Sequence, residues 1–311
     1  MLEMSEYRKR WGLSVSSMSN FARCPRLFYY KNGLGLERDG RSDDALKFGE
    51  ALHFALPWTY EGDLGQAIKA FDEIWQDREG DKKRNQTIAR SMLLNFMSSH
   101  QKDSSTSLYD LTPPPESPEG VQKLSKNEVW FAVDIGLPVP VVGRVDACGT
   151  HRDTKEWWGI EYKTSARMST WFLQNFELSP QLSTYVLGLQ ESSGKKCRGV
   201  ILEGLLVAAS RAATFVQPFY VSDYDLEELV TWYRGLWKML ERCEEENDFP
   251  KNFACCSPYT AFGSPGYVCE FAPLCQTEKW EELLSMFVVK PENPCWTRRG
   301  EEKDANSNAK C

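Results

Sequence analysis

GRVDACGTHRDTKEWWGIEYKT, at residues 143–164, covers the end of one apolar-leaning segment, a polar turn and a second apolar-leaning segment. The segments are Val139–Ala147 and Trp157–Tyr162, and the turn occupies residues 149–153. Apolar segments on either side of a short polar turn predict a β-hairpin. We therefore expect the charged residues at the two strand ends to lie together at one end of a sheet.

Three of these charged side chains suit the chemistry of a metal-dependent phosphodiesterase. Residues two apart in a strand share a face, so Glu161 and Lys163 are expected to point the same way, with Tyr162 pointing into the fold. Together with Asp146, they supply two carboxylates for a hard divalent cation and a lysine to orient or activate the attacking water. A hairpin with a surface salt bridge is the simpler interpretation, because Asp and Glu-x-Lys also occur by chance.

Composition describes a folded chain without a global positive charge. The 311 residues can bury a substantial core, and 41% hydrophobic with 26% charged residues is ordinary. The net charge of −7 means that nucleic-acid binding would need a local basic groove and bridging metal ions. Because the sequence contains neither a membrane-length apolar run nor a signal-peptide core, we expect a cytoplasmic protein without a membrane partner.

The remaining sequence predicts an α/β fold with a central mixed sheet, because strand-like segments precede a helix and a returning strand. One domain is expected over residues 14–276, followed by a disordered tail at 290–311. Its expected parts are a helical part at 14–100, a linker at 101–126 that is rich in Pro and Ser, a sheet core at 127–246 and a cysteine loop at 247–276. The expected helices are 14–23, 45–60, 64–77, one ending near 100, 179–191 and 223–246, and the expected strands are 128–135, 139–147, 157–162, 199–207 and 214–220.

Three further polar side chains are candidates for the same site. His53 follows Gly49 by four residues, and the glycine allows a neighbouring element to approach closely. Beside the two carboxylates, its imidazole would complete a three-ligand site with open positions for water and phosphate. Gln181 and Tyr185 are four residues apart and so share one face of the helix after the Glu-x-Lys strand. Each also has an ordinary structural interpretation, as a surface or core histidine, a helix-start amide and a half-buried tyrosine.

The ten cysteines of a cytosolic chain argue against a disulfide framework and towards metal or Fe–S roles for some of them. Cys255, Cys256, Cys269 and Cys275 lie near the C-terminus, whereas Cys24 lies at the end of the first predicted helix. One thiolate of the adjacent pair could join the other three around an Fe–S cubane that staples the two ends of the fold together. Zn²⁺ could use the same ligands.

The assembled motifs resemble the RecB-like branch of the PD-(D/E)XK nuclease superfamily. They are GEALH at 49–53, GRVD at 143–146, EYK at 161–163 and QLSTY at 181–185. FARCPRLFYY at 21–30, with the C-terminal cysteines, is similar to the iron–sulfur-staple members, which include AddB-type nuclease domains and CRISPR-associated RecB-like exonucleases. The resemblance covers residues 14–276 and implies a restriction-endonuclease-like core, a mixed sheet flanked by helices.

The resemblance implies roles for the residues that match the family motifs. His53, Asp146 and Glu161 would bind Mg²⁺ or Mn²⁺, and the Tyr162 carbonyl would be a further ligand. Lys163 would be the catalytic lysine.

Gln181 and Tyr185 match the family's QxxxY element, which is implied to contact DNA and support the site, and Glu128 stands where these families often carry a further strand acid. A [4Fe–4S] cluster is implied, with Zn²⁺ as the alternative occupant. Its implied ligands are Cys24, Cys256, Cys269 and Cys275. The chain departs from the family in the long spacing between its C-terminal cysteines, which leaves both members of the adjacent pair open as ligands, and we favour Cys256.

The leading hypothesis is a metal-dependent DNA exonuclease in recombination, repair or phage DNA processing, in the cytoplasm of a bacterium or a phage-infected cell. Its substrate would be single-stranded DNA or DNA with free ends. No Walker-type GxxxxGK[ST] occurs, so we expect no helicase motor in this chain, which would act alone or with a separate helicase or recombination protein. The alternative is a DNA-end or single-strand binding Fe–S protein with residual or no cleavage, and a zinc-stapled structural protein is third. Intact Asp146, Glu161 and Lys163 favour the enzyme.

Overall fold

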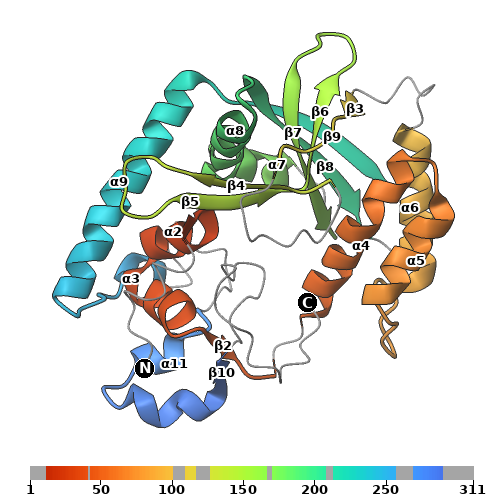
Figure 1. The fold of residues 1–311 in the computed structure, drawn as a ribbon. Helices are drawn as coiled ribbons and strands as arrows, with labels where there is room; N and C mark the ends of the chain where they lie inside the picture. The colour runs from red at the N-terminus through yellow and green to blue at the C-terminus, as the bar shows by residue number, and fades with distance from the viewer. Residues whose placement is uncertain are drawn as a thin grey trace, which may run out of the picture.

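A mixed five-stranded sheet forms the centre of the molecule (Figure 1). The structure, a computed structural model, describes residues 12–40, 43–100, 109–116, 127–166, 170–207, 213–256 and 269–289. The strand order is β3-β6-β7-β8-β9, in which only β7 and β8 run parallel. These strands are β3 (Tyr109–Leu111), β6 (Ala147–His151), β7 (Trp157–Ser165), β8 (Cys197–Leu206) and β9 (Thr214–Tyr220).

The parallel strands β7 and β8 are joined through two helices, α7 (Thr170–Glu177) and α8 (Pro180–Ser193). A parallel pair needs such a crossover, because the end of the first strand and the start of the second lie at opposite ends of the sheet. Helix α8 begins where the Ser179 side chain accepts the Gln181 N–H and Pro180 occupies the first turn. The crossover therefore brings the first turn of α8 back towards the sheet.

A second sheet has three strands, and it shows that the first strand of the predicted hairpin was drawn too long. The segment 139–147 is not one strand, because β5 (Val141–Val145) pairs with β4 (Val129–Val133) and β1 (Leu13–Ser14), whereas β6 is the hairpin partner of β7. The chain changes sheets at Asp146, whose Oδ2 accepts the Tyr162 N–H at 2.8 Å. Residues 149–151, predicted as turn, belong to β6.

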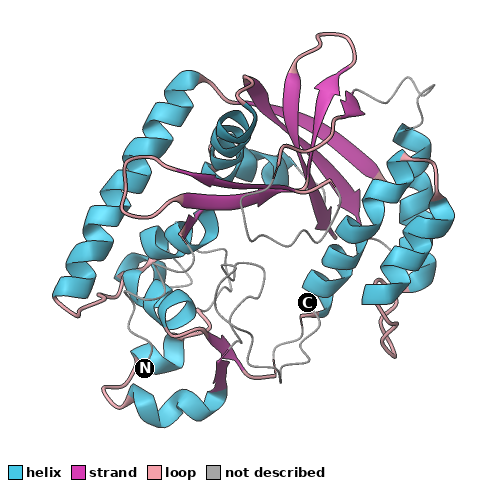
Figure 2. Ribbon diagram, in the orientation of Figure 1, coloured by secondary structure: helices cyan, strands magenta, loops and turns pink. Residues whose placement is uncertain are grey.

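Helices cover both faces of the sheets, and two large apolar clusters form between the layers (Figure 2). One cluster joins β7 and β8 to α4 (Asp44–Tyr60), α5 (Leu64–Ile74) and α6 (Gln86–His100). The other joins β4 and β5 to α2 (Val15–Arg23), α8 and α9 (Asp223–Glu245). This mixed α/β arrangement confirms the predicted fold class. Among the described helices, none combines the length and the apolar character needed to cross a lipid bilayer.

One region that was predicted to be irregular contains a strand. Within the predicted linker 101–126, β3 pairs with β6 at the edge of the central sheet. A three-residue edge strand is too short to produce a recognisable alternation, which explains why the sequence did not indicate it. The rest of that segment, 101–108 and 117–126, lies outside the described residues, as does the predicted tail at 290–311.

The N-terminal and C-terminal parts of the chain meet in a third apolar cluster. There β2 (Leu36–Arg38) pairs antiparallel with β10 (Phe287–Val289). Stacked and tilted rings join Tyr30, Phe271 and Phe287. The smaller elements at this end are α3 (Pro25–Phe28), η1 (Tyr29–Gly33), α10 (Phe253–Cys256), α11 (Ala272–Cys275) and η2 (Trp280–Met286).

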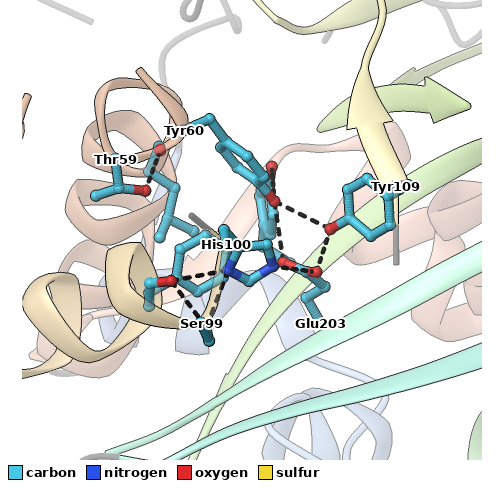
Figure 3. A network of polar contacts seen from close by, with 9 residues as sticks. Thr59, Tyr60, Ser99, His100, Tyr109 and Glu203 are labelled. Atoms are coloured by element: carbon cyan, nitrogen blue, oxygen red, sulfur yellow. Dashed lines mark hydrogen bonds and ion pairs between the residues drawn. The ribbon is translucent and has the colours of Figure 1, made fainter. Parts of the chain in front are cut away.

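A buried polar network lies between α4, α6, β3 and β8 (Figure 3). His100 Nε2 lies 2.8 Å from Glu203 Oε1, and His100 Nδ1 lies 2.8 Å from the Phe96 carbonyl. The hydroxyls of Tyr60 and Tyr109 both donate to the Glu203 carboxylate. A protonated histidine donates from both ring nitrogens, so these contacts suit the charged form.

We predict that this ion pair makes stability depend on pH. Burial lowers the pKa of His100, but the hydrogen bond and charge of Glu203 outweigh burial and raise that pKa above its usual value. The stabilisation is therefore fully present below the unfolded pKa of about 6.5 and is lost as pH rises through the folded pKa. The melting temperature of the wild type should fall over this range. His100→Gln should flatten the fall, whereas His151→Gln, at the half-buried last position of β6, should keep it.

A second prediction concerns the close packing of α4 on β7. A Cβ atom at Gly49 would lie 2.8 Å from Thr164 Oγ1, so Gly49→Ala should push the helix away and cost about 1–3 kcal/mol of unfolding free energy. Chemical denaturation should show that Thr164→Ala restores part of this loss in the double variant. The control is Gly235→Ala, where a Cβ meets nothing within 4 Å. Equal stability of the two single variants would contradict the close contact.

Candidate active site

The charged residues of the Glu-x-Lys strand lie on one face, as predicted. The Lys163 ammonium contacts Glu161 Oε1, and both side chains are largely buried. Tyr162 points to the opposite side of β7, where it is only 1% exposed and packs in the cluster beneath α4. Its backbone N–H donates to Asp146, so the two sheets meet at this point of β7.

The pKa values of the two carboxyl groups are shifted in opposite directions. Burial raises the pKa of Glu161 to about 7, and the charge of Asp146 acts in the same direction against the opposing Lys163. Burial also disfavours ionised Asp146, but His53 and the Tyr162 N–H outweigh it and hold its pKa well below the usual range. One buried negative charge is therefore well supported here, and a second is costly without another cation.

Lys163 is held in its charged form. Burial lowers its pKa, but the adjacent Glu161 and then Asp146 raise it to a net value above the usual one. A lysine with a raised pKa is a poor general base and a good electrostatic partner for an anion. In this arrangement Lys163 can neutralise developing negative charge or hold a water by donating to it.

His53 approaches the carboxylates from α4, on the side predicted from its spacing to Gly49. Its Nδ1 lies 3.6 Å from Asp146 Oδ2, and its ring makes an edge contact with Tyr162 at 5.8 Å between centroids. The helix can come this close because Gly49 presents no side chain to Thr164 of β7. The structure thus brings the imidazole beside the carboxylate that stays ionised.

Gln181 and Tyr185 approach from the first turns of α8. Gln181 Nε2 lies 3.4 Å from Glu161 Oε1 and donates to the Tyr185 hydroxyl at 2.6 Å. Burial and the charge of Glu161 raise the pKa of Tyr185, so its phenol remains protonated and able to donate. All the predicted polar residues of the site therefore converge on one end of β7.

These residues fit a hard divalent cation. The side-chain donors that lie here are two carboxylates and one imidazole, a set that Mg²⁺ and Mn²⁺ accept. The proximity of Asp146 disfavours ionised Glu161, and a cation between them would relieve that repulsion. Among the described residues, no trio of His, Cys, Asp or Glu side chains already surrounds a common metal position. Glu161 Oε1 is held by Lys163 and Gln181 in this arrangement.

Sequence reasoning did not single out Arg144, although it lies within the GRVD motif. The guanidinium sits over the Trp130 ring at 5.3 Å, and its NH1 lies 3.1 Å from Glu128 Oε1. Its charge lowers the pKa of both Lys163 and Tyr185, so Arg144 belongs to the electrostatic environment of the site. Glu128, considered as a further strand acid, holds this arginine and the Trp130 indole. The signal in the sequence was a basic residue two positions before Asp146.

Three of the four favoured cysteines, Cys24, Cys269 and Cys275, belong to the third apolar cluster at the junction of the chain ends, whereas Cys256 is exposed. Burial raises the pKa of Cys275 to about 11, and Cys269, Cys256 and Cys24 each add to the rise. Cys24, at the C-terminal end of α2, is buried, and its Sγ accepts the Asn252 N–H at 3.4 Å.

The adjacent Cys255 has a different environment from Cys256. Its Sγ accepts a hydrogen bond from Asn252 Nδ2 at 3.3 Å. The pKa of Cys256 is raised by burial and then by the charge of Cys24. Burial raises the pKa of Cys269 too, with Cys24 and Cys256 adding to it. The residues between the cysteine pair and Cys269, 257–268, lie outside the described part of the chain.

Two proteins of known structure are similar to this chain. A crystal structure of a candidate exonuclease from Eubacterium rectale is 16% identical over 85% of this chain and 91% of its own, with a TM-score of 0.48. The crystal structure of SSO0001 is 13% identical over 76% of this chain and 82% of its own, with a TM-score of 0.29. Neither likeness is close enough to show a shared fold, and curated protein sequences give no match. Residues 12–276 match the family model of the PD-(D/E)XK nuclease superfamily, so this chain belongs to that superfamily.

Proposed function

We propose that this protein is a divalent-metal-dependent DNA exonuclease of the RecB-like type. The observation that carries the proposal is the convergence of Asp146, Glu161 and Lys163 at the end of β7, with His53 beside Asp146. Membership of the nuclease superfamily supports phosphodiester hydrolysis, and DNA is the implied substrate. The order of the four site motifs supports the RecB-like type and, with it, an action on single strands or free ends.

Each side chain has a role in this proposal that follows from its surroundings. A bound Mg²⁺ or Mn²⁺ would supply Lewis-acid polarisation of the phosphate and lower the pKa of a coordinated water. His53, Asp146, Glu161 and the Tyr162 carbonyl would hold it. Lys163, released from Glu161, would donate to the attacking water or to the phosphate oxygens and offset their negative charge.

The α8 residues and the nearby arginine would hold the substrate. Gln181 and Tyr185 present an amide and a protonated phenol, which can donate to a phosphate oxygen beside the reacting one. Arg144 uses one guanidinium nitrogen for Glu128 and retains further donors for DNA phosphate. On a chain with a net charge of −7, such local cations are the means of gripping DNA.

We further propose that Cys24, Cys256, Cys269 and Cys275 bind a [4Fe–4S] cluster, with Zn²⁺ as the alternative. Support comes from the mutual electrostatic influence of these thiols and from the meeting of the two chain ends around them. Metal binding lowers thiol pKa values, so a cluster would remove the cost that burial places on the thiolates. This type of enzyme suggests a role in recombination, repair or phage DNA processing. It also suggests a separate helicase or recombination protein as a partner.

The DNA-binding alternative makes the opposite prediction for the catalytic residues. Asp146→Asn and Lys163→Ala should each lower single-turnover cleavage of end-labelled single-stranded DNA by about 100-fold or more, because each removes charge stabilisation in the transition state. DNA affinity in Ca²⁺ should change much less. Lys196→Ala removes an exposed lysine paired with Asp223 and should leave cleavage unchanged.

Two results would contradict the enzyme assignment. One is a wild-type protein that binds DNA but shows no cleavage with Mg²⁺ or Mn²⁺, which would support the binding module. The other is a folded Asp146→Asn variant that cleaves at the wild-type rate. Products released as single nucleotides from one end would support the exonuclease mode over internal cutting.

The cysteine proposal predicts a difference between two groups of variants. Cys24→Ser and Cys275→Ser should lose iron, visible absorbance and thermal stability in anaerobically purified protein, because cluster binding contributes to folding free energy. Cys243→Ser and Cys255→Ser should keep all three. Stoichiometric zinc without iron would favour the Cys₄ zinc site. Iron loss in Cys255→Ser but not in Cys256→Ser would make Cys255 the ligand in place of Cys256.

A further inference from the structure

The buried network of Figure 3 continues to the catalytic strand. The Tyr162 hydroxyl donates to the Tyr60 hydroxyl at 3.1 Å, and Tyr60 donates to Glu203 Oε2 at 3.0 Å. Tyr162 and Glu203 are direct partners in the register of β7 and β8. A continuous set of polar contacts therefore runs from His100 on α6 to the residue that separates Glu161 from Lys163.

This network joins the same two elements that carry the metal-binding candidates. Tyr60 is the last residue of α4, the helix of His53, and Tyr162 belongs to β7, the strand of Glu161. The backbone N–H of Tyr162 donates to Asp146. One residue thus touches Asp146 through its backbone and the end of α4 through its hydroxyl.

We propose that Tyr60, Glu203 and His100 are positioning residues that set the separation between His53 on α4 and the carboxylates at β7. The inference rests on the proposed function, because it concerns the metal site of that enzyme. None of the three needs to touch metal or DNA. They act through Tyr162, whose hydroxyl they hold and whose backbone supports Asp146.

The composition of the network favours positioning over simple space filling. Glu203 and His100 are 1% and 8% exposed, and burial of a charged pair is often no more stabilising than apolar residues of similar volume. The network restricts geometry more than it adds stability. A carboxylate that accepts from two hydroxyls and an imidazole leaves few positions open to these side chains. Burial raises the pKa of Tyr60 and of Tyr162, so both hydroxyls keep the protons they donate.

The decisive variant is Tyr60→Phe, which keeps the ring and removes the hydroxyl that bridges Tyr162 to Glu203. Calorimetric titration of Mn²⁺ without DNA should show an affinity about five- to tenfold weaker than that of the wild type, the effect of about one buried hydrogen bond. Cleavage should need correspondingly more Mn²⁺, while the rate at saturating Mn²⁺ stays within about threefold. Tyr162→Phe, which removes only the Tyr60 contact, should reproduce the effect if Tyr60→Phe does not fold.

The matched control is Tyr233→Phe. Tyr233 is also fully buried and makes one hydroxyl contact, 3.1 Å from Thr184 Oγ1, in the other apolar cluster. It should lose thermal stability without losing Mn²⁺ affinity. If Tyr60→Phe and Tyr162→Phe also lose stability only, the network is structural and the inference is wrong. If the wild type neither binds Mn²⁺ nor cleaves DNA, the proposed function itself fails, which is a distinct result.

Discussion

The hydrogen bond from the Tyr162 N–H to the Asp146 carboxylate is the contact on which the rest of the site depends. Asp146 stands where the chain leaves the three-stranded sheet and enters the central one, so this bond joins the point of crossing to β7. Together with the larger effect of His53, it also keeps Asp146 ionised beside Glu161, which burial drives towards its neutral form. Fold and chemistry therefore share one short piece of backbone.

The cost of burying these charges is met from several directions. Asp146 is supported by His53 and a backbone donor, and Glu161 by Lys163 and Gln181. The contributing groups come from α4, β7 and α8, elements well separated in the sequence. A site assembled in this way can form only when the main apolar clusters have packed, since each supporting side chain is carried by a different layer.

Much of this arrangement could be predicted from the sequence, and the errors have identifiable causes. Long amphipathic helices such as α4 and α9 follow from their apolar periodicity, and Glu161 and Lys163 share a face because strands alternate. The division of the predicted strand at Asp146 could not be foreseen, because it depends on a side-chain contact with a residue sixteen positions away. The Tyr60–Glu203–His100 network was missed for the same reason, as its members are far apart in sequence and none belongs to a motif.

The pairing of β2 with β10 has a consequence for how the protein is made. Residues 36–38 emerge early in synthesis, whereas their partners, 287–289, emerge only after all the other described elements. Until then Tyr30 and Leu36 lack the Phe271 and Phe287 surfaces that bury them. The N-terminal segment therefore lacks these contacts, and is open to the cell's chaperones and proteases, until the C-terminal elements that cover it have left the ribosome.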